Sequence, residues 1–334
     1  MKYKSNISVG HFPAQPHCFA YGGFDIQMNR VIDLLNSDYG GNIRINPWQK
    51  ECKFDLAHFW GTELSHSVAF RFCKERNIPC VVSVLIPNHG LNSVFAMRAK
   101  GFARTLIKGK SFFADADIVT VINDQQALLA RYVYGVDPSK IRVIPTIVDD
   151  AFFQENNHSV SDTKSVLCVG TIGPRKNQLN LLRAAKELDV DVVLCGRFDD
   201  SNPSYIQQIA HELEMNSSRF RYYSDISADK LVDLYLETRV VACVSHHETE
   251  PASVLEAMIL NRGVVVSNLP FGRNPRFTGA EYCDPLSIDS IKNALKNSIA
   301  KPKSEFPNFI SFAHRSEAVV NSYQELYLHL LGKK

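Results

Sequence analysis

Adjacent cations in the second half of the chain could bind a diphosphate. Arg175 and Lys176 follow two nearby glycines, Gly170 and Gly173. A guanidinium binds phosphate oxygens through a fork and an ammonium acts as a point charge, so the two together suit a diphosphate. The glycines would let the backbone approach the ligand closely. A charged pair before a helix is more often only solvated, so these residues alone are a weak signal.

Two carboxylates, Glu248 and Glu256, flank a predicted helix start at Pro251. Proline suits the first position of a helix because its missing N–H would have no partner there. The amides that follow would form an anion site together with the helix dipole; they are those of Ala252, Ser253 and Val254. The two carboxylates could accept hydrogen bonds from sugar hydroxyls. They could equally be a solvated loop acid and an acid favoured by the dipole.

Alternating strands and helices must position these residues. Apolar runs alternate with helical patterns along nearly the whole chain, which is typical of parallel sheets with crossover helices. In the first half the pattern predicts strands at residues 56–59, 80–86, 118–122 and 141–144, and helices at 24–36, 64–76 and 125–134. The polar segment 149–163 is predicted to be a linker. The second half predicts strands at 165–169, 190–195, 219–223, 240–244 and 263–266, helices at 178–188, 205–214, 228–237 and 251–260, and a terminal helical stretch at 311–331.

Composition limits the class of protein. The chain has 334 residues, 45% of them hydrophobic and 22% charged, which suits a globular protein of two domains. A formal net charge of +2 argues against a nucleic-acid partner, because coating a phosphate backbone needs a dominant basic surface. Eight cysteines without a C-x-x-C pair or zinc-finger spacing indicate a reducing compartment and no metal site. With no apolar signal-peptide core and no spanning stretch, a cytoplasmic location is expected.

Several motifs recur in an order known from one family. A Gly22-Gly23 loop is followed by VIPTIVD at 143–149, VGTIGPRKN at 169–177 and LCGR at 194–197, and then by Glu248 and Glu256 in an E-x7-E arrangement. In these motifs the chain resembles the GT-B glycosyltransferases, specifically the large retaining group called family 4. The resemblance implies an α/β fold of two Rossmann-like domains facing across a cleft. The expected domains are 1–155 for the acceptor, 156–310 for the donor, and a helix at 311–334 that crosses back to the first domain.

The resemblance also implies roles for individual residues. Arg175 and Lys176 would hold the donor diphosphate and stabilise its charge as it leaves, and Glu248 would contact hydroxyls of the transferred sugar. Glu256 would bind the ribose, and the amides from Ala252 to Val254 would meet the distal phosphate. The remaining donor-site positions are glycines: Gly22, Gly23, Gly170, Gly173 and Gly196. A front-face retaining path is expected, with no metal and no cofactor besides the nucleoside-diphosphate sugar.

The acceptor side departs from the family pattern. Many members carry a histidine after the strand expected at 80–86, and His89 is close to that position but out of register. His246 or His247 is expected to line the sugar pocket. Glu250 and Pro251 replace an aromatic-glycine pair, and Asn177 replaces a glycine.

The function implied is sugar transfer to a hydroxyl of a glycan or lipid-linked glycan in bacterial surface polysaccharide synthesis. A basic segment at 98–110, interleaved with apolar residues, could lie on an anionic membrane at the inner face of the cell membrane, or could be an ordinary exposed helix. Two alternatives stay open: a nucleotide-sugar epimerase on the same fold, and a non-catalytic nucleotide- or glycan-binding relative. Retention of Arg175, Lys176, Glu248 and Glu256 weighs against the latter.

Overall fold

In a computed structural model, the chain forms two compact units. The structure describes residues 7–13, 22–46, 52–61, 66–86, 115–154, 163–308 and 312–333. Unit 1 comprises Met1–Ile147 together with Phe312–Lys334, and unit 2 comprises Val148–Ser311. The division at Ile147 precedes the expected boundary at residue 155, and the terminal segment belongs to unit 1.

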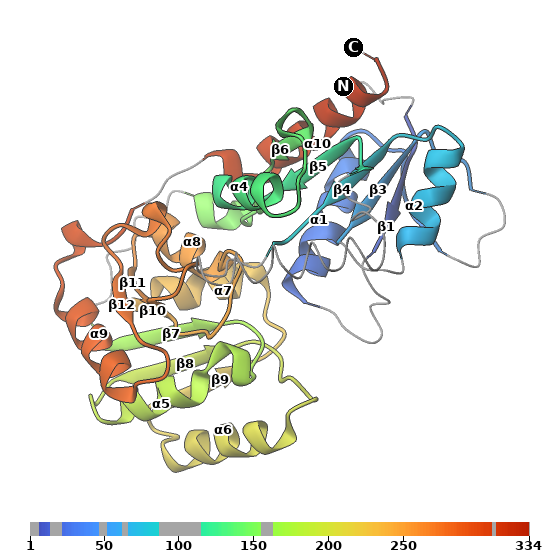
Figure 1. The fold of residues 1–334 in the computed structure, drawn as a ribbon. Helices are drawn as coiled ribbons and strands as arrows, with labels where there is room; N and C mark the ends of the chain where they lie inside the picture. The colour runs from blue at the N-terminus through green and yellow to red at the C-terminus, as the bar shows by residue number, and fades with distance from the viewer. Residues whose placement is uncertain are drawn as a thin grey trace. The chain divides into compact units, whose positions relative to one another are not determined.

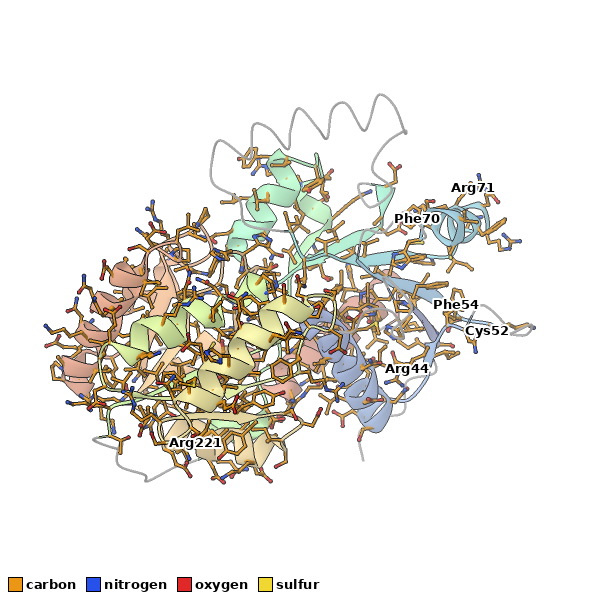
Figure 2. All side chains as sticks on the ribbon, turned by 90° about the horizontal axis from the view of Figure 1, so that it is seen from below. Arg44, Cys52, Phe54, Phe70, Arg71 and Arg221 are labelled. Atoms are coloured by element: carbon orange, nitrogen blue, oxygen red, sulfur yellow. The ribbon has the colours of Figure 1, made fainter. Side chains whose placement is uncertain are left out.

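Unit 1 contains a six-stranded parallel sheet covered on both faces (Figure 1). Its order is β2-β1-β3-β4-β5-β6, made by β1 (Val9–Phe12), β2 (Asn42–Arg44), β3 (Leu56–Trp60), β4 (Cys80–Ser83), β5 (Ile118–Val121) and β6 (Ile141–Val143). One face carries α1 (Gly23–Asp38) and α10 (Ser316–Leu330), and the other carries α2 (His66–Glu75) and α4 (Asp124–Tyr132). Side chains along a strand alternate between faces, so Leu56 packs with α1 and α10 whereas Ala57 packs with α2 and α4. On α2, Phe70 is buried whereas its neighbour Arg71 lies on the surface (Figure 2).

A row of buried polar rings lies between the unit 1 sheet and α10. The ring nitrogens of His58 lie 2.7 Å from Tyr327 Oη and 2.7 Å from Ser83 Oγ. Trp60 Nε1 donates to His11 Nδ1 at 3.1 Å, so that nitrogen carries no proton and Nε2 of His11 donates to Asn42 Oδ1 at 3.0 Å. Burial lowers the pKa of His11 to about 4. The neutral ring is therefore part of the folded core.

Unit 2 contains a second six-stranded parallel sheet, in the order β12-β11-β10-β7-β8-β9 (Figure 1). Its strands are β7 (Ser165–Val169), β8 (Asp191–Cys195), β9 (Phe220–Tyr223), β10 (Val240–Cys243), β11 (Gly263–Ser267) and β12 (Glu281–Cys283). One face packs against α5 (Gln178–Lys186), α6 (Pro203–Met215) and α9 (Ile288–Ala300). The other packs against α7 (Ala228–Leu236), α8 (Ala252–Ile259) and the 3-10 helix η3 (Asp150–Phe153). Because η3 packs in this core, the start of the segment expected to be a linker is instead part of unit 2.

The strand order of unit 2 defines where a ligand would bind. The chain leaves β7 toward β8 and β9, and then returns to place β10 on the other side of β7. In such sheets the loops after the two diverging strands separate, and the crevice at their carboxyl ends receives the ligand. The loop after β7 contains Arg175 and Lys176, and the loop after β10 contains Glu248. The topology therefore brings the predicted cations and the predicted carboxylate to one edge of the sheet.

Candidate functional site

The two cations and Glu248 form one charged cluster in unit 2. Glu248 Oε1 lies 2.8 Å from Lys176 Nζ and 2.8 Å from Arg175 Nη1. Arg175 Nη1 also donates to the His247 carbonyl oxygen at 3.0 Å. The side chains of Lys176 and Glu248 are only 13% and 10% exposed, whereas Arg175 is 51% exposed. The cluster thus has a buried ion pair at its base and a guanidinium open to solvent above it.

Burial and charge oppose each other within this pair. Burial works against the charged ammonium of Lys176, but the Glu248 carboxylate outweighs it and raises the pKa of Lys176. Burial likewise works against ionised Glu248, but Lys176 and Arg175 outweigh it and lower the pKa of Glu248. All three side chains are therefore charged near neutral pH, with a net charge of about +1.

The backbone of the first loop is fixed by its turn residues. The 3-10 helix η4 (Pro174–Lys176) begins with a proline and ends at Asn177, which has a left-handed φ of 61°. Asparagine tolerates this conformation better than most residues. Asn177 Nδ2 donates to the carbonyls of Val244, at 3.2 Å, and Pro285, at 2.7 Å, while His246 N donates to Arg175 O at 2.8 Å. These bonds join the loop after β7 to the segments that follow β10 and β12. No sequence motif predicted the role of Asn177.

Two predicted glycines have conformations that glycine alone adopts easily. Gly170 has a φ of +135°, and a Cβ there would lie 2.7 Å from Lys176 Cε. Gly196 has a φ of +149°, and a Cβ there would overlap the Gly170 carbonyl. Gly173 is extended, and its Cβ would lie 3.1 Å from Asp199 Cβ. Gly170 thus allows Lys176 to lie against the backbone, and Gly196 allows the chain after β8 to approach the chain after β7 closely.

The helix that follows Glu248 starts one residue later than the sequence predicted. Pro251 is the N-cap of α8 and has an extended conformation, so the first helical residue is Ala252. Within the first turn of α8, Val254 N donates to Pro251 O at 3.0 Å. The anion site at the amides of Ala252, Ser253 and Val254 stays a prediction.

Glu256 lies in the second turn of α8 and is held by a tyrosine from a different helix. Tyr235 Oη, on α7, donates to Glu256 Oε2 at 2.5 Å and lies 3.3 Å from Ser253 O. Tyr235 is completely buried and Glu256 is partly exposed. No sequence pattern predicted this contact, because Tyr235 lies on the apolar face of a helix and its pattern predicts a core residue.

Glu250, which the resemblance marked as unusual, is buried and has a charged partner that is partly exposed. Its Oε1 lies 3.5 Å from Nη1 of Arg276, and its side chain is 1% exposed. Arg276 belongs to the 3-10 helix η5 (Pro275–Phe277), whose N-cap Asn274 accepts a hydrogen bond from Arg276 N. This pair fixes the loop between Glu248 and α8.

The other predicted residues lie apart from this cluster or outside the described residues. Gly22 and Gly23 belong to unit 1, where Gly22 is the N-cap of α1 and its N–H donates to Asp25 Oδ2 at 2.8 Å. His246 is exposed and joins the site through its backbone. His89 and the basic segment 98–110 lie outside the described residues. In the described ranges no group of His, Cys, Asp and Glu could hold a metal ion, and no helix is long and apolar enough to span a membrane.

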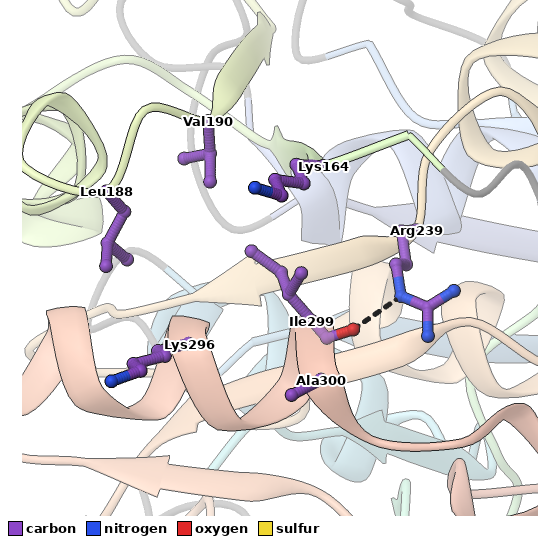
Figure 3. A pocket seen from close by; sticks show the side chains of 7 residues that line it. All are labelled: Lys164, Leu188, Val190, Arg239, Lys296, Ile299 and Ala300. Atoms are coloured by element: carbon purple, nitrogen blue, oxygen red, sulfur yellow. Dashed lines mark hydrogen bonds between the residues drawn. The ribbon is translucent and has the colours of Figure 1, made fainter.

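A cavity of about 530 Å³ lies elsewhere in unit 2. Lys164, Val190 and Arg239 in its lining precede β7, β8 and β10, which places it at the amino ends of the strands. Arg239 Nε donates to Ile299 O at 2.7 Å across it (Figure 3). The remaining lining residues are Leu188, Lys296 and Ala300. This cavity is at the opposite edge of the sheet from Lys176 and Glu248.

Several known proteins resemble the chain. It is 27% identical to the O-antigen chain mannosyltransferase RfbU of Salmonella typhimurium over 53% of this chain and 50% of that protein, so it spans about half of that relative. It is 22% identical to the D-inositol 3-phosphate glycosyltransferase of Saccharomonospora viridis over 96% of this chain and 80% of that protein. Among solved structures, HepE of Anabaena in complex with UDP and glucose has a TM-score of 0.68 at 14% identity, with 97% and 100% of the two chains covered. Sucrose-phosphate synthase of Thermosynechococcus elongatus has a TM-score of 0.71 at 17% identity, with 97% and 99% covered.

Two family models match consecutive parts of the chain. The model of Glycosyltransferase Family 4 matches residues 26–152, and the model of Glycosyl transferases group 1 matches residues 149–305. The second match contains the charged cluster and both carboxylates of the E-x7-E arrangement. With two parallel Rossmann-like sheets of the kind found in its structural relatives, the chain belongs to the family 4 glycosyltransferases of the GT-B fold.

Proposed function

We propose that this protein transfers a sugar, with retention of configuration, from a nucleoside-diphosphate sugar to a hydroxyl of a glycan or lipid-linked glycan. The observation that carries the proposal is the convergence of Arg175 and Lys176 on Glu248 at the switch point of unit 2. Fixed cations at such an edge suit a leaving diphosphate, whose charge grows as the glycosidic bond breaks.

The roles follow from the charge and accessibility of each group. Arg175 is half-exposed and can bind phosphate oxygens through its fork, while buried Lys176 supplies a positive charge held in place by Glu248. When a diphosphate shares the two cations, Glu248 can accept hydrogen bonds from the sugar hydroxyls. Glu256, partly exposed on α8, is assigned to the ribose.

The retaining path is a front-face exchange. The bond from the anomeric carbon to the phosphate oxygen breaks, and a bond to the acceptor oxygen forms on the same face. The acceptor proton goes to the leaving phosphate oxygen. Glu248 is a poor candidate for a covalent nucleophile, because two cations stabilise its charge and lower its pKa.

The similar proteins support a hexose donor and a surface-polysaccharide setting. Two of them are bacterial mannosyltransferases of O-antigen or serotype-specific type, and one structural relative was solved with UDP-glucose. We assign the protein to the cytoplasm, at the inner face of the membrane where a lipid-linked acceptor would lie. Co-sedimentation with anionic liposomes that weakens with added salt would support this location, and no binding at low salt would contradict it.

Release of nucleoside diphosphate from a panel of sugar donors, with and without glycan acceptors, tests the proposal. A transferase releases the diphosphate with a glycosylated acceptor, and proton NMR of the product reports whether the anomeric configuration is retained. An epimerase would convert the donor without an acceptor, and a binding protein would bind the donor without turnover. Activity that survives EDTA supports a path without metal. Unchanged turnover in Arg175→Ala and Lys176→Ala would contradict the assigned site.

A further inference from the structure

Tyr235 holds the carboxylate that the proposed function assigns to the ribose. We propose that Tyr235 is a positioning residue for nucleotide binding: it fixes Glu256 so that one carboxylate oxygen faces the vicinal hydroxyls of the donor ribose. This inference rests on the proposed function and adds a residue to its nucleotide site.

The contact joins two helices on one face of the unit 2 sheet. Tyr235 on α7 donates to Glu256 Oε2 at 2.5 Å, and the same hydroxyl lies 3.3 Å from the Ser253 carbonyl one turn earlier on α8. Both partners of the hydroxyl are thus on α8. A rotation of the Glu256 side chain would have to break the shorter of these bonds.

The tyrosine ring is itself immobilised. Tyr235 is completely buried, and its ring packs edge-on against Phe152 of η3 with the centroids 5.2 Å apart. A ring enclosed in this way has one accessible orientation, so the position of its hydroxyl is set by the core. The core of unit 2 therefore determines where the Glu256 carboxylate points.

The hydroxyl can act only as a donor to this carboxylate. Burial, together with the neighbouring Glu256 charge, raises the pKa of Tyr235 well above its usual value, so the proton stays on the hydroxyl. A carboxylate has about four acceptor sites on two oxygens, and the bond from Tyr235 uses one of them. The partial exposure of Glu256 leaves it accessible to a ligand.

A contact to ribose acts equally in the ground state and the transition state, because the ribose is remote from the bond that breaks. Loss of that contact raises KM for the donor and leaves kcat nearly unchanged. The cations Arg175 and Lys176 act on the developing charge, so their loss lowers kcat. A raised KM with a nearly unchanged kcat therefore distinguishes Tyr235 from a residue whose replacement disturbs the whole site.

The test is Tyr235→Phe, which removes one hydroxyl and keeps the ring. Binding of UDP and GDP is measured by calorimetry, and the 2′,3′-dideoxy form of whichever binds is measured alongside. We expect Tyr235→Phe to weaken binding of the natural diphosphate about tenfold, the effect of one hydrogen bond to a charged group. Binding of the dideoxy form should change less than about twofold, and adding Glu256→Gln should cause little further loss.

A matched control is Tyr39→Phe in unit 1, which removes a hydroxyl that donates to Asn321 Oδ1 at 2.6 Å and should leave nucleotide binding unchanged. If Tyr235→Phe does not fold, Phe152→Leu loosens the ring and should weaken UDP or GDP binding by a smaller factor. Equal binding by wild type and the Tyr235 or Phe152 variant, or equal losses for natural and dideoxy ligands, would overturn the inference. Wild-type protein that binds no nucleoside diphosphate would instead refute the proposed function.

Discussion

Replacement of Glu248 by glutamine should affect nucleotide binding and turnover in opposite directions. Glu248 carries the negative charge that lies 2.8 Å from both Arg175 and Lys176. Glutamine has nearly the same shape but no charge, so the local charge rises from about +1 to about +2. A bound diphosphate would then meet two unopposed cations instead of two cations shared with a carboxylate.

The structure sets the size of the effect. At about 4 Å and an effective dielectric constant of about 20, one unit charge contributes about 4 kcal/mol. Arg175 is 51% exposed, so solvent and salt screen much of this. We expect a gain of about 1–2 kcal/mol for the free nucleoside diphosphate, or roughly tenfold tighter binding. Turnover should fall roughly tenfold to a hundredfold, because the charged hydrogen bond to the sugar is lost.

Stability should fall as well, since Lys176 is 13% exposed and loses its partner. Breaking a buried pair costs about 3 kcal/mol, and saturating nucleotide should recover part of that loss. Calorimetric titration with UDP and GDP gives the affinity, diphosphate release gives kcat, and urea unfolding gives the free energy of unfolding. Glu237→Gln, at an exposed position on the same unit, is the control for charge. Weaker diphosphate binding in Glu248→Gln, in proportion to the loss of turnover, would refute the electrostatic reasoning.

Three further predictions concern burial and backbone shape. The pKa of His11 is about 4 in the folded protein and 6.5 in the unfolded chain. The neutral ring therefore contributes fully to the free energy of unfolding above pH 6.5, and this contribution is lost as the pH falls toward 4. Urea unfolding should show the free energy of unfolding fall by about 3 kcal/mol over this range, a fall that His11→Gln lacks. Gly170→Ala should displace Lys176 and lower turnover at least tenfold, whereas Gly40→Ala, also at positive φ but with open space around it, should change only stability. Asn177→Asp turns a carboxylate oxygen toward two carbonyls, whereas Asn177→Gly keeps the left-handed backbone. Asn177→Asp should therefore have a lower melting temperature than Asn177→Gly, corresponding to a free energy of unfolding that is lower by roughly 2 kcal/mol. An equal loss in the two Asn177 variants would contradict that reason.

Local patterns predicted most of the central strands and helices. The buried strands of both sheets are continuous apolar runs, and β7 was predicted at its observed bounds, Ser165–Val169. No bounds were predicted for β1, and the edge strands β2 and β12 were missed, since β2 and β12 have three residues each, several of them polar or exposed. The helix α9, although amphipathic, was also missed. A short edge strand is stabilised by pairing with its neighbour, which its own residues do not encode.

The bounds of the functional loops were less accurate. Pro251 was predicted to be the first helical residue and is the N-cap, a position where its φ of −74° is equally acceptable. The Val254 amide, predicted to bind an anion, donates to the Pro251 carbonyl at 3.0 Å in this first turn. The segment predicted as a linker begins with Asp150–Phe153 in the core of unit 2, because Phe152 packs against Tyr235 despite its polar surroundings in sequence.

The sequence by itself determined the fold class and the chemical character of the site, because periodicity reports burial and because Arg, Lys and Glu are the groups that handle phosphates and hydroxyls. Only the tertiary structure decided which of these groups meet. Arg175 and Glu248 are 73 positions apart, and they touch because the strand order places β10 beside β7. Tyr235 reaches Glu256 for a similar reason, since α7 and α8 pack on the same face of one sheet. Long-range contacts depend on the order in which strands pair, and no local pattern of residues specifies that order.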